Sequence, residues 1–380
     1  MPIFISCSKA LARACWGREK LESIAAEAAK KRIKCYFVAS RAELIAHEAA
    51  YLAEPSSLVI IPGNEREMLN IRAEFAGLPL HVIVFAHHFH DMFESEFSYV
   101  MSDLSDAMQC AIRHLQSRKC TSPALFAVGR ESYHDCCREE TFRRFSGTES
   151  PRVFHSVGKL KDTTKALLQT REPIDALLCV NDLFALALMP LLSALDPAWN
   201  RKMLLLGFSD TIVGALHRPA LTSLTLGYAA GGREVVHIHR AIPKNEQLAC
   251  MHAVMKSVLA ARETTAADAP RGICFADYPE LSDSRLAELL GSYNDLMRLE
   301  NLLHTCDSID YRLIAALLEG SSQSEAAEQL FLTTDSIKYR VRKIRRQLRC
   351  ESTQALTAFL RTWIDKANLQ KHMETVLTAE

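Results

Sequence analysis

The chain contains 380 residues, 48% of them hydrophobic, and its 45 basic and 45 acidic side chains give a formal net charge of zero. This is the composition of an ordinary soluble protein, and no apolar run reaches the ~20 residues that cross a bilayer, so we expect no membrane partner. The start at Met1 lacks the charged and long apolar regions of a signal peptide. Twelve cysteines without a C-x-x-C pair favour free thiols in a reducing cytoplasm over disulfides or a zinc site.

From residue 1 to about 280, short β-branched or aromatic segments alternate with helix-like segments, which predicts parallel sheets covered by helices. The expected helices include Arg18–Lys31, Ser105–Ser117 and Leu183–Ala194. The expected strands are Ile3–Cys7, Cys35–Ala39, Leu58–Pro62, Val82–Ala86, Ala124–Val128, Ala176–Val180 and Met203–Gly207.

Several segments of this region together carry a family resemblance. They are Val100–Asp106, Arg138–Phe142, Ala176–Asp182, Leu205–Asp210 and Pro219–Leu224. In order and spacing they resemble the effector-binding domain of lactose-repressor (LacI/GalR) proteins across most of residues 1–282, although Thr141 replaces a family glycine. The resemblance implies a two-lobed α/β domain of the type I periplasmic-binding-protein-like fold, with a ligand bound in the cleft between the lobes.

The positions that match the family's ligand contacts are Asp103, Arg138, Asn181 and Asp182. Carboxylates accept hydroxyl hydrogens and a guanidinium donates in a flat fork, so the set suits a small polyhydroxylated effector such as a sugar or related polyol. Each of these residues could instead cap a helix or form a salt bridge between the lobes. Trp16 or Tyr133 could stack on a sugar face, although a core position is the ordinary fate of such residues.

Two further clusters lie outside this resemblance. His87, His88 and His90 follow an expected strand and could face a metal or the ligand, but without a thiolate or second acidic partner at metal spacing we expect a metal-free loop. Cys136 and Cys137 precede Arg138, and we expect a buried, inert helix start rather than a redox sensor. No cofactor is implied. Because the chain has no G-x-S-x-G, P-loop or G-x-G-x-x-G motif, we expect a sensor and not an enzyme.

After the α/β region, residues 264–272 are expected to form a surface loop, and Ile273–Phe275 a last strand. An amphipathic helix is expected over Ser284–His304, with apolar residues near a and d positions of a heptad and Glu300 interrupting them. Such a helix could pack on its own domain or form the seam of a homodimer. In either case it connects the sensor to the last region of the chain.

The last region predicts four helices. The first spans Asp307–Leu318 and ends at Gly320, and a capping-box sequence at Ser322–Glu325 opens the second. A four-residue turn, Phe331 to Thr334, leads to a third helix, in which Ile337, Val341, Ile344 and Leu348 form one apolar stripe. Between Asp335 and Arg346 this third helix holds six cationic side chains against one carboxylate, which points to a polyanion such as DNA. A fourth helix is expected from Ser352 to Trp363.

This succession is a helix-turn-helix, and over about Leu302–Ile364 it resembles the LuxR-type DNA-binding domain. The family pattern is matched at Leu332, Thr333, Ser336, Ile337, Lys338, Ile344 and Leu348. Arg340 and Gln347 depart from the family's usual His and Lys, so the operator sequence cannot be inferred. The resemblance implies that the Thr333 hydroxyl caps the recognition helix. The expected DNA-contacting residues are Thr333, Ser336, Lys338, Tyr339, Arg342, Arg345 and Arg346.

The sequence therefore predicts a two-lobed sensor at 1–282, a connecting helix at 283–305, an all-α helix-turn-helix domain at 306–366 and a tail at 367–380. This order departs from the lactose-repressor family, in which the DNA module precedes the sensor. We expect a homodimeric, ligand-responsive transcriptional regulator that reads double-stranded DNA, with effector binding altering the spacing of two recognition helices. The alternatives are a cytoplasmic solute-binding or sensor protein that never touches DNA and an enzyme built on the sensor fold.

Overall fold

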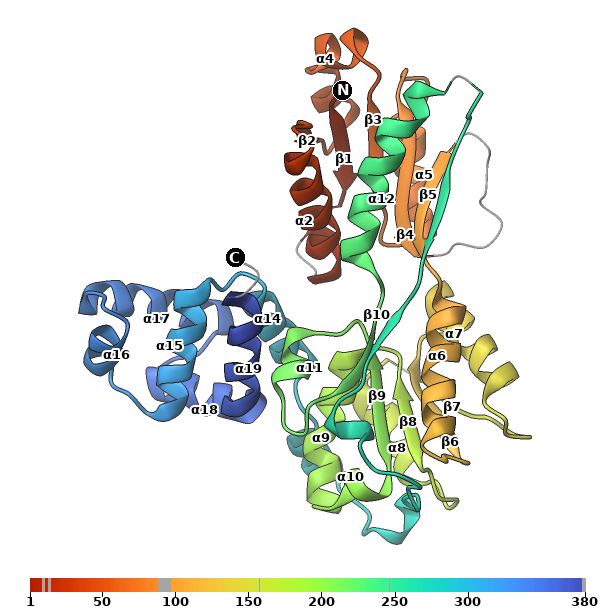
Figure 1. The fold of residues 1–380 in the computed structure, drawn as a ribbon. Coiled ribbons are helices and arrows are strands. Elements are labelled where there is room, and N and C mark those ends of the chain that lie inside the picture. The colour runs from red at the N-terminus through yellow and green to blue at the C-terminus, as the bar shows by residue number, and fades with distance from the viewer. Residues whose placement is uncertain (9–10, 13–14, 88–96, 157, 246, 378–380) are drawn as a thin grey trace. The chain divides into compact units, whose positions relative to one another are not determined.

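The structure is a computed structural model that describes residues 1–380 except 9–10, 13–14, 88–96, 157, 246 and 378–380 (Figure 1). The chain divides into two compact units, Met1–Cys110 with Thr225–Val258, and Ala111–Leu224 with Leu259–Glu380. It therefore passes from one unit to the other three times. Each unit contains a six-stranded sheet, so the predicted α/β domain of two lobes is confirmed.

The sheet of the first unit has the strand order β11-β5-β4-β3-β1-β2, and its paired strands are parallel. The strands are β1 (Ile3–Cys7), β2 (Cys35–Phe37), β3 (Ser57–Ile61), β4 (His81–His87), β5 (Phe97–Ser102) and β11 (His252–Met255). The helices are α2 (Cys15–Lys30), α3 (Arg41–Ile45), α4 (Glu48–Ala53), α5 (Glu65–Glu74), α12 (Tyr228–Ala241) and η1 (Ile242–Lys244), and α6 (Leu104–Ser117) crosses the boundary between the units.

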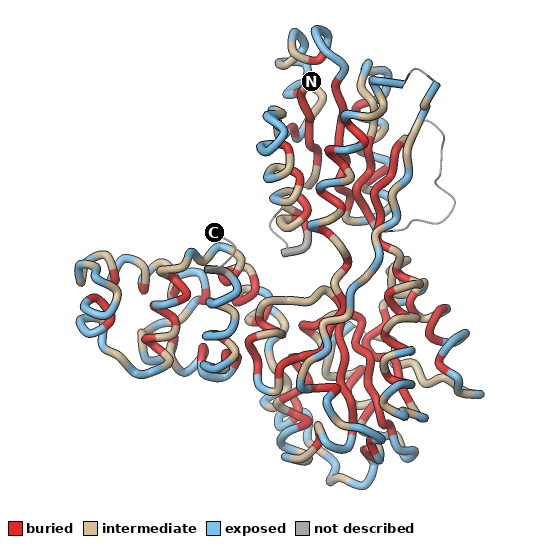
Figure 2. Tube along the Cα trace, viewed as in Figure 1, coloured by how far each residue is buried: buried red, intermediate tan, exposed pale blue. Residues whose placement is uncertain are grey.

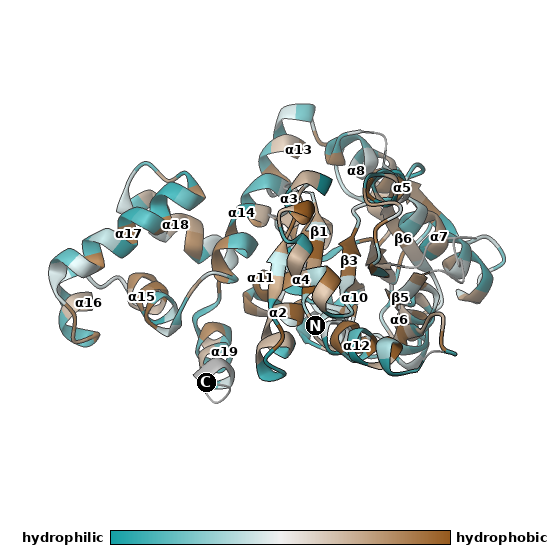
Figure 3. Ribbon diagram, turned by 90° about the horizontal axis from the view of Figure 1, so that it is seen from above, coloured by the Kyte–Doolittle hydropathy of each residue, from teal (hydrophilic) through white to brown (hydrophobic). Residues whose placement is uncertain are grey.

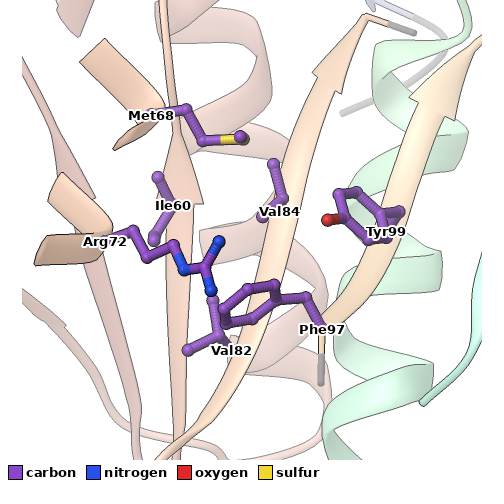
Figure 4. A pocket seen from close by; sticks show the side chains of 7 residues that line it. All are labelled: Ile60, Met68, Arg72, Val82, Val84, Phe97 and Tyr99. Carbon is purple, nitrogen blue, oxygen red and sulfur yellow. The ribbon is translucent and has the colours of Figure 1, made fainter. Parts of the chain in front are cut away.

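Helices cover both faces of this sheet because its central strands are mostly apolar on both sides and must be buried on both. All five residues of β3 are buried. Helices α2 and α12 pack against each other on one face, whereas α5 lies on the other (Figures 1 and 4). Beneath α5 a small apolar pocket is lined by Met68, Val84 and Tyr99, and the Arg72 guanidinium lies 4.8 Å from the centre of the Phe97 ring (Figure 4).

The sheet of the second unit has the order β12-β10-β9-β8-β6-β7. Its strands are β6 (Pro123–Val128), β7 (Arg152–His155), β8 (Ala176–Cys179), β9 (Leu204–Phe208), β10 (Thr222–Thr225) and β12 (Val258–Ala260). The surrounding helices are α7 (Tyr133–Phe145), α8 (Leu160–Leu168), α9 (Asp182–Leu195), α10 (Trp199–Lys202), α11 (Ile212–Leu216), η2 (Glu263–Thr265) and η3 (Phe275–Asp277). Every residue of β6, β8 and β9 is buried (Figure 2).

The remaining elements of the second unit are all helices. They are α13 (Asp283–Leu289), α14 (Tyr293–Leu303), α15 (Ser308–Glu319), α16 (Gln323–Gln329), α17 (Thr334–Leu348), α18 (Thr353–Trp363) and α19 (Lys366–Leu377). The predicted terminators are present: Gly320 takes a left-handed φ of 91° after α15, and the Ser322–Glu325 capping box opens α16. The apolar stripe of α17 is buried, as its spacing predicted.

The connecting helix differs from its prediction, because it is two helices instead of one. The helix is interrupted at Gly291, whose N–H donates to the Ala187 carbonyl at 2.9 Å. Ser292 then caps the start of α14. A Cβ at position 291 would stand 3.2 Å from the Ala187 Cα and 2.5 Å from the Trp363 ring, so only glycine fits this approach. Both helices pack against α9 of the same unit rather than presenting a continuous seam.

Other predicted boundaries were also wrong. Thr264 and Thr265 are buried in η2 rather than exposed in a surface loop, since their hydroxyls bond to Thr222. Ile273 makes an isolated antiparallel bridge to Ile174, and no strand is assigned over the described residues 273–275. The described part of the expected tail, 367–377, belongs to α19, which packs against α15 and buries Leu369.

Candidate functional site

The carboxyl-terminal edge of the second sheet holds unusual backbone. Ser209 and Asp210 follow β9 with φ values of 119° and 51°, and Ala127, at an irregularity in β6, has a φ of 67°. Side chains with a Cβ rarely adopt such angles, and the cost is tolerated where the surroundings fix the conformation, most often at functional sites. Because ligands of parallel α/β sheets bind at this edge, the strain marks it as the candidate site.

Arg138 lies at this edge and is buried, with 7% of its surface exposed. Its Nη1 donates to Asp135 Oδ1 at 2.9 Å, and its guanidinium lies 5.2 Å from the centre of the Phe208 ring. Within the described part of the chain its Nε has no hydrogen-bond partner. A buried donor without a partner is costly, so this geometry suits a ligand oxygen.

Three further residues at this edge of the sheet were not predicted as site residues. Asp135 orients the guanidinium and also accepts from the Gly129 N–H at 3.0 Å. The Phe208 ring makes a cation–π contact with Arg138. Asp210 Oδ1 accepts a hydrogen bond from the Arg262 guanidinium at 2.6 Å. The sequence did contain a signal for two of them, since Phe208 and Asp210 belong to the segment that carried the family resemblance.

Asp182 has a structural role in this arrangement. It is 1% exposed, and its carboxylate accepts from the Thr211 N–H at 2.7 Å, the Thr211 hydroxyl at 3.0 Å and the Ser223 hydroxyl at 2.6 Å. Burial raises the pKa of Asp182 to about 6. Gly207 permits this packing, because a Cβ there would stand 2.9 Å from the Asp182 Cα. We therefore remove Asp182 from the proposed ligand contacts.

Asn181 and Asp103 both cap helices, which is the alternative considered for them from the sequence. The Asn181 Oδ1 accepts from the Phe184 N–H at 2.9 Å, and the Asp103 Oδ1 accepts from the Asp106 N–H at 2.9 Å. Both residues are half-buried. Asp103 belongs to the first unit, whereas Asn181 and Arg138 belong to the second. That these residues meet around one ligand remains a prediction.

The secondary candidates differ in how far the structure describes them. Tyr133 begins α7 and is half-buried. Cys136 is exposed and donates to the Arg130 carbonyl, so the expected burial at this position was wrong. The side chains of Trp16 and His87, together with residues 88–96 including His88 and His90, lie outside the described residues. Where the structure describes the chain, no three metal-ligating side chains gather.

The second candidate surface is the outer face of α17, whose ribbon is largely hydrophilic (Figure 3). Lys338, Tyr339, Arg342 and Arg346 are exposed, and Tyr339 has 67% of its surface accessible. Lys338 lies 3.5 Å from Asp335, an exposed ion pair of small energetic weight. The Thr333 hydroxyl accepts from the Ser336 N–H at 3.2 Å, which confirms the expected cap.

Two other cations of α17 are engaged with the protein. The Arg340 guanidinium contacts Asp307 at 2.9 Å and Asp310 at 2.6 Å, and these carboxylates raise the pKa of Arg340 against the opposing effect of burial. The Arg345 guanidinium donates to the carbonyls of Cys350 and Glu351, where it holds the turn after the helix. We therefore remove Arg345 from the proposed DNA contacts.

Comparisons with known proteins give the class of fold. No family model matches the chain, and no curated protein sequence matches it. Solved structures do match, and they are LacI-type regulators and periplasmic-binding-protein-like proteins. The chain thus has the two-lobed fold of these proteins. The structure also contains no described helix long and apolar enough to span a membrane.

Three of the matched structures illustrate the similarity. The regulator CelR in complex with cellobiose is 18% identical, with a TM-score of 0.55 over 69% of this chain and 84% of that one. A dimeric Lac repressor is 14% identical, with a TM-score of 0.54 over 70% and 100%. A periplasmic binding protein/LacI regulator from Alkaliphilus metalliredigens, complexed with D-xylulofuranose, is 16% identical, with a TM-score of 0.50 over 70% and 99%. At these identities the match concerns the fold.

Proposed function

We propose that the protein is a ligand-responsive transcriptional regulator that reads double-stranded DNA with α17 and is not an enzyme. The observation that carries this proposal is the division of α17 into a buried apolar stripe and an exposed face with Lys338, Arg342 and Arg346. A helix fixed by one face and cationic on the other fits the major groove, where phosphates attract cations. The LuxR-type resemblance of this domain supports the same assignment.

The effector in this proposal is a small polar molecule, a sugar or related polyol, bound between the lobes. Arg138 is its principal contact, and Asn181 and Asp103 are further contacts. One feature supports a sugar: the planar Arg138 guanidinium can donate to vicinal hydroxyls, and its Nε has no hydrogen-bond partner among the described residues. Two of the matched proteins hold a sugar in their structures.

The proposed regulator acts as a homodimer, since two recognition helices spaced by one helical turn, ~34 Å, read two half-sites together. The matched Lac repressor is dimeric, which supports the proposal by similarity. A solute-binding protein that never touches DNA would have no use for the exposed cations of α17. We therefore favour the regulator over that alternative.

A thermal-shift assay with cellobiose and D-xylulose tests the effector site, because a ligand bound to the native state raises the melting temperature. We expect a shift with at least one related sugar or polyol in a wider panel. Arg138→Ala should abolish that shift, whereas Arg144→Ala, an exposed arginine on the same helix, should retain it. A shift that persists unchanged in Arg138→Ala would contradict the assignment of this site.

A further inference from the structure

Helix α11 lies between the candidate effector edge and the helical region that contains α17 (Figure 1). The strained segment Ser209–Asp210 leads directly into it, and Thr211 caps it while bonding to Asp182. The beginning of α11 is thereby tied to the same loops that surround Arg138 and Phe208. A shift of that edge has to move α11 or break these bonds.

Glu300 of α14 holds the start of α11 from the other side. Its Oε1 accepts from the Ile212 N–H at 2.9 Å, and its Oε2 accepts from the Val213 N–H at 2.8 Å. His304, one turn further along α14, contacts the same carboxylate at 3.1 Å. Glu300 is 1% exposed, so these hydrogen bonds are shielded from water. Removing the charged acceptor would leave the buried N–H groups unsatisfied and destabilise the fold.

The end of α11 is held by Asp365, which precedes α19, and by the first turn of α19. The Leu216 carbonyl accepts from the Asp365 N–H at 2.7 Å, and the His217 carbonyl accepts from the Asn368 side chain at 2.8 Å. The His217 and Trp363 rings lie 5.9 Å apart. Both ends of this short helix are therefore bound to the helical region, and its buried residues Val213 and Leu216 fill the space between.

Helix α14 in turn packs against α17. Leu296, Leu299, Leu302 and Leu303 of α14 are all buried, so α14 cannot slide without repacking the core beneath α17. Close-packed cores respond to such a displacement by switching between discrete arrangements rather than by bending gradually. A continuous series of contacts thus runs from the effector edge through α11 and Glu300 to the recognition helix.

We propose that α11, held by Glu300, is the coupling element that links effector binding at the sheet edge beside residues 209–211 to the placement of α17. This inference rests on the proposed function and specifies its regulation. It assigns the link between sensor and DNA reader, expected at the Ser284–His304 helix, to a contact inside one subunit. Coupling is reciprocal, so DNA bound at α17 must also alter the segment around Ile212.

Reciprocity gives a test that needs no effector. Hydrogen exchange of the full-length protein is measured by mass spectrometry with and without a 30-base-pair mixed-sequence duplex at low salt. In the wild type we expect the duplex to change the amide exchange rates of residues 209–213 by at least about fivefold. That factor is the lower end of the usual coupling between two binding sites. In Glu300→Gln, where one of two carboxylate acceptors is lost, the duplex should bind but change this exchange less than twofold.

Glu288→Gln is the matched control, since it makes the same substitution at an exposed site of the neighbouring α13 and should behave as the wild type. If Glu300→Gln does not fold, Asn368→Ala removes the bond at the other end of α11 and should weaken the response likewise. A duplex that binds without changing exchange at 209–213, or a full response in Glu300→Gln, overturns the coupling while leaving the regulator proposal intact. A wild type that binds no duplex overturns the regulator proposal itself.

Discussion

Replacing Asp182 with alanine separates a structural role from a ligand-binding role. The substitution leaves the buried Thr211 N–H without its acceptor, which costs about 1–3 kcal/mol, whereas the Thr211 and Ser223 hydroxyls can rotate to other acceptors. We therefore expect the free energy of unfolding at pH 7 to fall by about 1–3 kcal/mol without any ligand. Urea denaturation followed by tryptophan fluorescence measures it. Asp103→Ala, which removes a half-buried cap, should cost about 1 kcal/mol.

The pH dependence of this loss gives a second measure. Burial raises the native pKa of Asp182 from 3.8 to about 6, so the native carboxyl takes up a proton between pH 7 and pH 5 and the unfolded one does not. Stability linked to this group is therefore present at low pH and lost as pH rises through about 6. The deficit of Asp182→Ala should grow by about 1 kcal/mol on lowering the pH from 7 to 5. A deficit that vanishes at pH 7, or that shrinks as pH falls, refutes the structural role.

Three other substitutions have expected outcomes. Gly207→Ala should prevent the second unit from folding stably, seen as loss of soluble protein, because the new Cβ meets the backbone of Asp182; a normal melting temperature would contradict this. Ser322→Ala should lower stability by about 1 kcal/mol in urea denaturation by removing the capping box, and no change would show that the cap is dispensable. Arg340→Ala should also lower stability, yet leave the salt dependence of DNA binding unchanged in filter binding, since Arg340 is engaged by Asp307 and Asp310; a flatter dependence would place Arg340 on the DNA.

Local rules predicted the helical region well because its signals lie close together in the chain. The φ of Gly320, the Ser322 capping box and the buried stripe of α17 each follow from residues within four positions of one another. The apolar strands β1, β3, β6, β8 and β9 were found for a similar reason. Strands β7, β10, β11 and β12 are only three or four residues long, and they were missed. The longer strand β5 was also missed, because Ser98 and Ser102 interrupt its apolar residues.

The chemistry of the site depends on partners far apart in sequence, which periodicity cannot reveal. In the sequence, Glu300 was interpreted as an interruption of an apolar heptad pattern. In the structure its carboxylate oxygens accept hydrogen bonds from backbone N–H groups 87 and 88 residues away. Asp182 matched a ligand-contacting position, and only the fold shows that Ser223, 41 residues later, occupies its carboxylate. Gly291 likewise breaks the connecting helix because α9 approaches it, not because of its neighbours in the chain.

The salt dependence of DNA binding tests the central claim most directly. Each phosphate contact contributes about −0.9 to the slope of log affinity against log salt concentration, so the full-length protein should bind a duplex with a steep slope. Replacing both Lys338 and Arg342 with alanine should weaken binding. It should also reduce the steepness of the slope by the contribution of about two phosphate contacts per subunit. The sugar-induced thermal shift should survive in this variant. Failure of the wild type to bind DNA at low salt, or an unchanged slope in the double variant, would contradict the account.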